Sequence, residues 1–116
     1  MTSLGQLERA VMDVVWSATG AVTARDVMSS LAGRDLAYTT VLTVLSRLER
    51  KGLLVRDKGQ RAHTYLAAAS REDHIAVLMS QALGQADDRA AVLVHFARTV
   101  SAAEATALRI ALEARP

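Results

Sequence analysis

The 116-residue chain contains no cysteine, and only 3% of its residues are aromatic. Without thiols it can form neither disulfides nor thiolate metal sites. Hydrophobic residues still make up 51% of the chain, so its core must be aliphatic. No run approaches the roughly 18 apolar residues of a membrane span, and the first residues lack the basic-then-apolar pattern of a signal peptide. We therefore expect a cytoplasmic protein with no membrane insertion.

Enzyme signatures are also missing from the sequence. There is no phosphate-binding loop, nucleophile elbow, dinucleotide fingerprint or HExxH motif. The three histidines, His63, His74 and His95, do not show the spacing of any standard metal site. We expect a protein that is not an enzyme and that carries neither a metal nor another cofactor.

Positive charge is concentrated in one short stretch of the chain. Residues 47–61 hold six basic and two acidic residues, a net charge of +4, whereas the other residues sum to −2. A basic stretch on a slightly acidic body is the pattern expected of a nucleic-acid contact.

The segment Ala37 to Lys51 overlaps this stretch and has helical periodicity with two chemically different faces. Hydroxyl groups occupy the first half of the polar face and guanidinium groups the second half, with Thr40 and Lys51 at its border. An ordinary solvated surface helix would show the same division. The inward face comprises Val41, Val44, Leu45 and Leu48, and the outward face Thr39, Thr43, Ser46, Arg47 and Arg50.

The neighbouring segments give this helix a context. A helix is expected over 4–18, and a second, short one starts at the capping-box sequence Thr23–Asp26 and ends at Gly33. Gly52 suits the left-handed position that ends a helix. Two apolar stretches, 53–55 and 62–66, flank a polar loop with a glycine, which indicates a β-hairpin. Three helices followed by a basic hairpin predict a winged helix-turn-helix domain over 1–69.

Residues 70–116 are expected to form three further helices and a dimerisation region. Ser70 and Ser101 begin capping boxes, and Asp87 and Asp88 precede the middle helix. These helices are too few and short for a core of their own, so we expect a two-fold homodimer; folding back as a monomer is the alternative. The first of them has an apolar side made of Ile75, Leu78, Met79, Ala82 and Leu83.

The chain resembles the penicillinase repressor family of winged-helix repressors over nearly its whole length. The similar stretches are Leu7-Glu8 with Val11-Met12 and Trp16, Tyr38 to Leu48 with Lys51 to Leu54, Arg61-Ala62 with Tyr65, and Leu93 to Phe96 followed by a helix near Ser101.

The resemblance implies a homodimeric repressor that binds inverted repeats in double-stranded DNA and controls β-lactamase or related antibiotic-resistance genes. It also implies release: a membrane β-lactam sensor protease, or a protease that it activates, triggers cleavage in the dimerisation region. In the family the cleaved bond joins Asn to Phe; here Phe96 matches, but His95 replaces the Asn. The copper-responsive branch uses cysteine ligands, which this chain lacks.

The residues expected to contact DNA lie on the third helix and the hairpin. Arg47 is the candidate base reader, since two hydrogen bonds from arginine match guanine. Thr40 could instead cap or bond the helix backbone. The full set is Tyr38, Thr39, Thr40, Thr43, Arg47, Arg50, Lys51, Lys58 and Arg61.

Two other functions fit the same fold. One is a winged-helix module for protein–protein contact, which should expose apolar residues on the outward face of the third helix. The other is a winged-helix regulator that responds directly to a small effector; the scarcity of aromatic residues argues against the pocket it would need.

Overall fold

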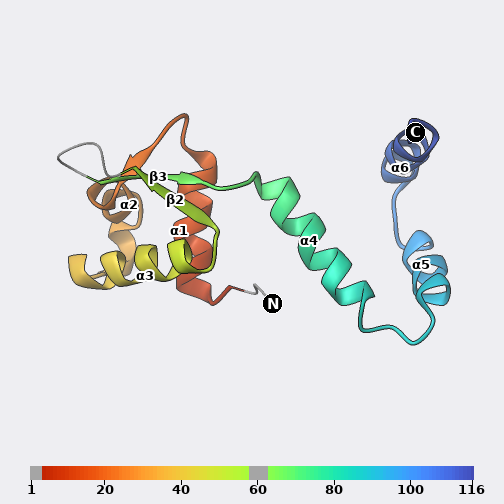
Figure 1. Ribbon diagram of the computed structural model, residues 1–116, viewed down its shortest axis with the longest axis horizontal. Coiled ribbons are helices and arrows are strands. Elements are labelled where there is room, and N and C mark those ends of the chain that lie inside the picture. Colours follow the sequence, from red (N-terminus) through yellow and green to blue (C-terminus); the bar gives the residue numbers. More distant parts are fainter. Residues whose placement is uncertain (1–3, 58–62) are drawn as a thin grey trace. The chain divides into compact units, whose positions relative to one another are not determined.

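A computed structural model describes residues 4–57 and 63–116. The chain divides into two compact units, Met1–Leu78 and Met79–Pro116. The elements drawn in Figure 1 are, in chain order, α1 (Gln6–Ser17), β1 (Val22–Thr23), α2 (Ala24–Ser30), the 3-10 helix η1 (Ala32–Arg34), α3 (Tyr38–Arg50), β2 (Leu54–Asp57), β3 (Thr64–Ala67), α4 (Arg71–Leu83), α5 (Arg89–Ala97) and α6 (Ala102–Glu113).

The first unit has the predicted winged-helix architecture, mostly helical with a small antiparallel sheet. Its core is aliphatic except for Tyr65. The four residues predicted to form the inward face of α3 are all buried, none more than 4% exposed, so this prediction is confirmed. They pack in one cluster with Val11, Met12 and Val15 of α1, Val22 of β1, Ala24 and Val27 of α2, and Leu54 of β2.

The connection from α2 to α3 differs in one detail from the expectation. The Thr23 capping box is present: the Thr23 hydroxyl accepts from the Asp26 amide at 3.1 Å, and an Asp26 oxygen accepts from the Thr23 amide at 2.9 Å. However, α2 ends at Ser30, and Gly33 lies within η1 rather than ending the helix. The left-handed residue is Asp35, with φ of 53°, and an aspartate tolerates that conformation better than most side chains.

The sheet extends the predicted hairpin by one strand. β3 is central and pairs antiparallel with β2 on one side and with the two-residue β1 on the other. Gly52 has φ of 80°, which confirms its predicted left-handed turn between α3 and β2. Because β1 immediately precedes α2, the pairing of Val22 with Tyr65 attaches the hairpin to the helix-turn-helix pair.

Within a single chain, the side chain that α4 buries is His74. Ile75 and Met79 of its apolar side are 43% and 53% exposed, whereas His74 is buried against α1. In the second unit, Asp88 and Ser101 cap α5 and α6 through their side chains. In the part of the chain that the structure describes, no helix is long and apolar enough to span a membrane.

Candidate nucleic-acid interface

The outward face of α3 is a row of exposed hydroxyl and guanidinium groups. Thr39, Thr40, Thr43, Arg47 and Arg50 are all exposed, on the side opposite the buried quartet. The structure thus brings five of the predicted DNA contacts together on one helix surface. The first helical residue, Tyr38, is 36% exposed, so part of its ring lies against the protein and part meets solvent.

The hydroxyl of Thr43 is fixed by the helix itself. Its Oγ1 donates to the Thr39 carbonyl at 2.9 Å, one turn earlier. The hydroxyl proton is therefore used within the helix, and the oxygen is left as an acceptor next to an outward methyl group. Thr43 can accept from a base amino group or contact a thymine methyl, but it is not a free donor.

Lys51 differs from the other predicted contacts because it is paired inside the unit. Its Nζ lies 2.9 Å and 3.0 Å from the two carboxylate oxygens of Glu8 at the start of α1. Glu8 is only 7% exposed and also accepts from the Gly5 amide at 3.1 Å. The hydrogen bond from Lys51 is the main cause that lowers the pKa of Glu8, although burial acts in the opposite direction. The pair joins the end of α3 to α1.

At the base of the hairpin, Arg56 makes polar contacts with two other side chains. The Arg56 Nε lies 3.6 Å from a Glu49 oxygen, and its Nη1 lies 3.3 Å from Nδ1 of His63. Lys58 and Arg61, the predicted wing contacts, fall outside the described residues.

A hollow of about 460 Å³ opens beside the start of α3. Its lining includes Arg25 of α2, Tyr38 and Leu42 of α3, His63, and Tyr65 of β3. Arg25, Leu42 and His63 were not predicted from the sequence to belong to this surface. Leu42 could have been identified from the sequence, because it is an apolar residue next to the polar face of α3. Arg25 could not, because only the fold brings α2 beside Tyr38.

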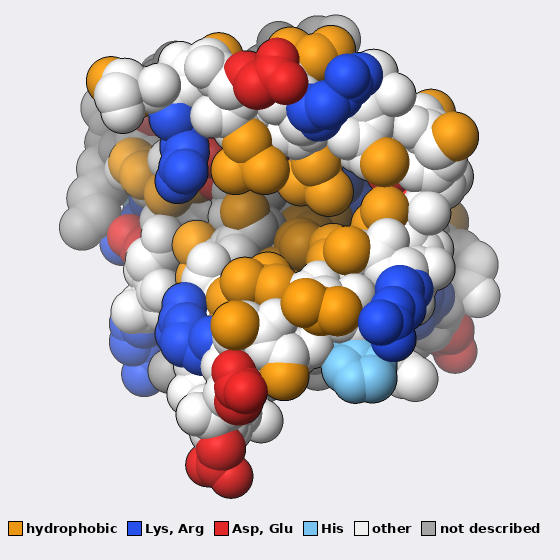
Figure 2. All heavy atoms as spheres, turned by 90° about the vertical axis from the view of Figure 1, so that its right-hand side faces the viewer, with side chains coloured by type: hydrophobic (Ala, Val, Ile, Leu, Met, Phe, Trp, Pro, Cys, Tyr) orange, Lys and Arg blue, Asp and Glu red, His pale blue; other side chains and the backbone are white. Residues whose placement is uncertain are grey.

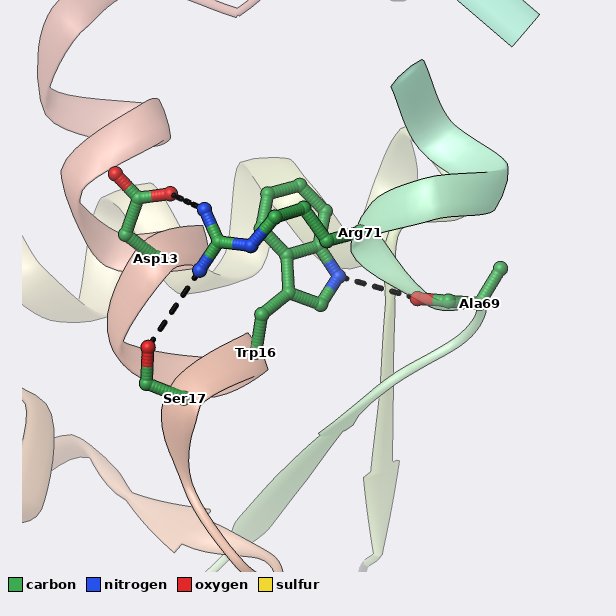
Figure 3. A network of polar contacts seen from close by, with 5 residues as sticks. All are labelled: Asp13, Trp16, Ser17, Ala69 and Arg71. Atoms are coloured by element: carbon green, nitrogen blue, oxygen red, sulfur yellow. Dashed lines mark hydrogen bonds and ion pairs between the residues drawn. The ribbon is translucent and has the colours of Figure 1, made fainter. Parts of the chain in front are cut away.

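Figure 3 shows how the first turn of α4 is attached to α1. Arg71 donates to an Asp13 oxygen at 2.7 Å, and its guanidinium carbon lies 5.1 Å from the centre of the Trp16 ring. The Trp16 indole donates to the Ala69 carbonyl at 3.1 Å. The centre of the Trp16 ring also lies 5.3 Å from that of the His74 ring. The lone tryptophan therefore links the helix that opens the unit to the segment that leaves it.

The second unit presents apolar side chains to solvent. Neither α5 nor α6, both described in full, has a buried residue. Figure 2 shows hydrophobic side chains gathered on the face that it presents. Within this unit, a hollow of about 460 Å³ is lined by Ala97, Val100 and Leu108, among others. The exposed large residues are Val92, Leu93, Val94, Phe96, Leu108, Ile110 and Leu112.

Within residues 4–57 and 63–116, no three His, Asp or Glu side chains come close enough to hold an ion. The bond between His95 and Phe96 lies inside α5, one residue before that helix ends at Ala97.

Comparison with known proteins covers almost the whole chain. A family model described as "Penicillinase repressor" matches residues 4–114. Proteins named "Transcriptional regulator BlaI" from two strains of Mycobacterium tuberculosis are 53% identical over 116 residues, which span 97% of this chain and 84% of theirs.

Proposed function

The chain belongs to the penicillinase repressor family of transcriptional regulators, and from that premise we propose that it is a homodimeric repressor that binds inverted-repeat operators. It acts in the cytoplasm on genes for β-lactamase or a related antibiotic response. The observation that carries this proposal is the outward face of α3, where hydroxyl and guanidinium groups outnumber the exposed apolar side chains of that helix.

The arrangement of that face suits a major groove. Short hydroxyl side chains near the start of α3 allow close approach to base edges, and Arg47 and Arg50 follow one to two turns later. Neither arginine forms an ion pair with a carboxylate of the described residues. Arg47 reads a guanine, where a good two-bond pair discriminates by about 1–3 kcal/mol, and Arg50 meets a phosphate. Lys58 and Arg61 are still proposed to contact the DNA backbone.

We assign Lys51 a supporting role within this function. Its ammonium group already has a carboxylate partner on a largely buried side chain. Moving it to a phosphate would leave the Glu8 charge without that partner, which is costly for a buried group. Lys51 therefore positions α3 against α1.

The dimer forms through the second unit. An exposed leucine, isoleucine, valine or phenylalanine gains about 1.5–3 kcal/mol when it is fully buried, and α5 and α6 expose seven such residues. A second copy presents the same surface, so a two-fold contact buries both sets at once. Two winged units related by this axis match the symmetry of an inverted repeat.

Release from the operator follows cleavage at or near the bond between His95 and Phe96. The trigger is a membrane β-lactam sensor protease or a protease that it activates. The bond lies close to the end of α5, where the last turn unwinds more easily than the middle of a helix. Cutting there separates α6 from the rest of the interface and weakens the dimer.

The test is a gel shift with the purified protein and the promoter of its own gene. Scrambled duplex is the competitor, and salt is titrated because phosphate contacts make affinity salt-dependent. We expect a shift that resists scrambled duplex, with one dimer per inverted repeat. A shift that any duplex abolishes equally, or no shift, would refute the proposal and favour the protein-interaction module.

A further inference from the structure

The hollow beside the start of α3 combines an apolar floor with a polar rim. Tyr38, Leu42 and Tyr65 line it together with Arg25 from α2 and His63 from the base of the hairpin. Leu42 is 37% exposed and, with Tyr38, adds apolar surface beside the hydroxyl and guanidinium groups of α3. The hollow therefore suits a ligand that has both an apolar and an anionic part.

Arg25 supplies a positive charge in a fixed place. Its guanidinium carbon lies 4.8 Å from the centre of the Tyr38 ring, a cation–π distance that holds the group above the ring. The neighbouring carboxylate, Asp26, accepts from the Thr23 amide. No ion pair joins Arg25 to a carboxylate in the part of the chain that the structure describes.

His63 supplies a directed donor. Arginine can only donate hydrogen bonds, so the contact of Arg56 Nη1 with His63 Nδ1 at 3.3 Å requires that Nδ1 accept. In the tautomer that accepts at Nδ1, the proton lies on Nε2, and the Nε2–H is available as a donor. The pairing of Arg56 with Glu49 keeps this arrangement in place.

We propose that this hollow binds one sugar–phosphate unit of the operator backbone. The phosphate lies between the guanidinium of Arg25 and the Nε2–H of His63, and the deoxyribose lies against Tyr38 and Leu42. This inference rests on the proposed function and adds two residues, Arg25 and His63, that position the duplex between the helix-turn-helix pair and the hairpin. Charge complementarity and the position of the hollow beside the proposed reading helix select this occupant.

Arg25 and His63 should differ in how much they contribute to the salt dependence of DNA affinity. Each phosphate neutralised by a cation contributes about 0.9 to the slope of log affinity against log salt. Arg25→Ala should therefore weaken binding roughly tenfold on operator and scrambled duplex alike and reduce the slope by about 1. Arg25→Lys keeps the charge and should keep the slope. His63→Ala removes a hydrogen-bond donor rather than a permanent cation, so affinity should fall several-fold while the slope changes less than in Arg25→Ala.

The measurement is fluorescence anisotropy of the full-length protein with labelled duplex over a salt series. Arg9→Ala is the matched control, because Arg9 is an exposed arginine of α1 that does not line the hollow. It should change neither affinity nor slope by a comparable amount. Circular dichroism verifies that every variant is folded.

A second measurement identifies the phosphate. Operators carrying one neutral methylphosphonate at a time should include a position that weakens wild-type binding but has little further effect on Arg25→Ala, because the two changes remove the same contact. If Arg25→Ala and His63→Ala bind like the wild type, or no such position exists, the inference is wrong while the proposed function stands. If the wild type itself does not prefer its operator, the proposed function fails and this inference fails with it.

Discussion

Trp16 donates its indole N–H to the carbonyl of Ala69, 3.1 Å away and 53 positions later in the chain. The same ring lies under the Arg71 guanidinium and beside the His74 ring. One side chain of α1 thus fixes both the end of the hairpin and the first turn of α4.

Replacing Trp16 by phenylalanine keeps an aromatic ring but removes the donor and part of the stacking area. We expect the free energy of unfolding to fall by about 1–2 kcal/mol, the sum of a net hydrogen bond and weakened ring contacts. Urea unfolding followed by circular dichroism at fixed protein concentration measures this. Ser17→Ala, which loses only the 3.5 Å contact with Arg71, is the control and should change stability far less. Equal losses in the two variants would contradict a special role for the indole.

The pair between Glu8 and Lys51 should make stability depend on pH. The pKa of Glu8 is lowered by its hydrogen bond from Lys51, so the folded state releases the proton more readily than the unfolded state. The stabilisation is therefore complete above the ordinary glutamate value of 4.5 and is lost as pH falls through the lowered value.

Lys51→Met should destabilise the unit by about 1–3 kcal/mol near neutral pH, because a buried carboxylate loses its partner. The deficit should shrink in acid, where Glu8 is protonated in both variants. Urea unfolding across the acid range tests this, with Arg50→Met as a control from the same helix end that has no carboxylate partner in the described residues. A deficit that stays constant with pH would show that the pair is not its cause.

Arg47→Ala should reduce operator binding more than binding to scrambled duplex. The expected loss of discrimination is about 1–3 kcal/mol, the worth of a two-bond contact with guanine. Competition gel shifts give both affinities in one experiment. Equal losses on both duplexes would make Arg47 a backbone contact.

Leu108→Asp should dissociate the dimer. Leu108 is 45% exposed and lines the hollow of the second unit, so a charge there would be buried at the proposed two-fold contact. Sedimentation equilibrium should show a monomer. Circular dichroism should show an unchanged helical spectrum. Ser80→Asp, a charge at an exposed polar position of α4, should leave the dimer intact. A dimeric Leu108→Asp protein would move the interface away from this face.

The sequence was informative where periodicity and local hydrogen bonds decide the structure. The inward quartet of α3, the capping box at Thr23 and the left-handed Gly52 all depend on residues within a few positions of one another. The end of α2 was missed because η1 continues the turn through Gly33, and Asp35 takes the left-handed conformation instead.

The rest depends on contacts between distant segments. Glu8 lies 43 positions from Lys51, and no local pattern links an acid in one helix to a lysine after another. His74 is buried because Trp16 lies beside it, although it falls off the apolar side of α4. Arg25 and Tyr38 meet only because the connection through η1 places α2 against α3. Contacts between side chains that only the winged fold brings together were therefore the ones that sequence periodicity could not predict.

The edge strand β2 has a consequence for how copies of the protein meet. Among the described residues β2 lies at one edge of the sheet and pairs with β3. The strand has four residues, and Arg56 and Asp57 form half of it. A short edge with charged residues is a poor template for strand addition by another molecule. The hairpin is therefore expected to resist the open-ended stacking that leads to fibrils, and the proposed two-fold contact, which closes on itself, is left to helical surfaces.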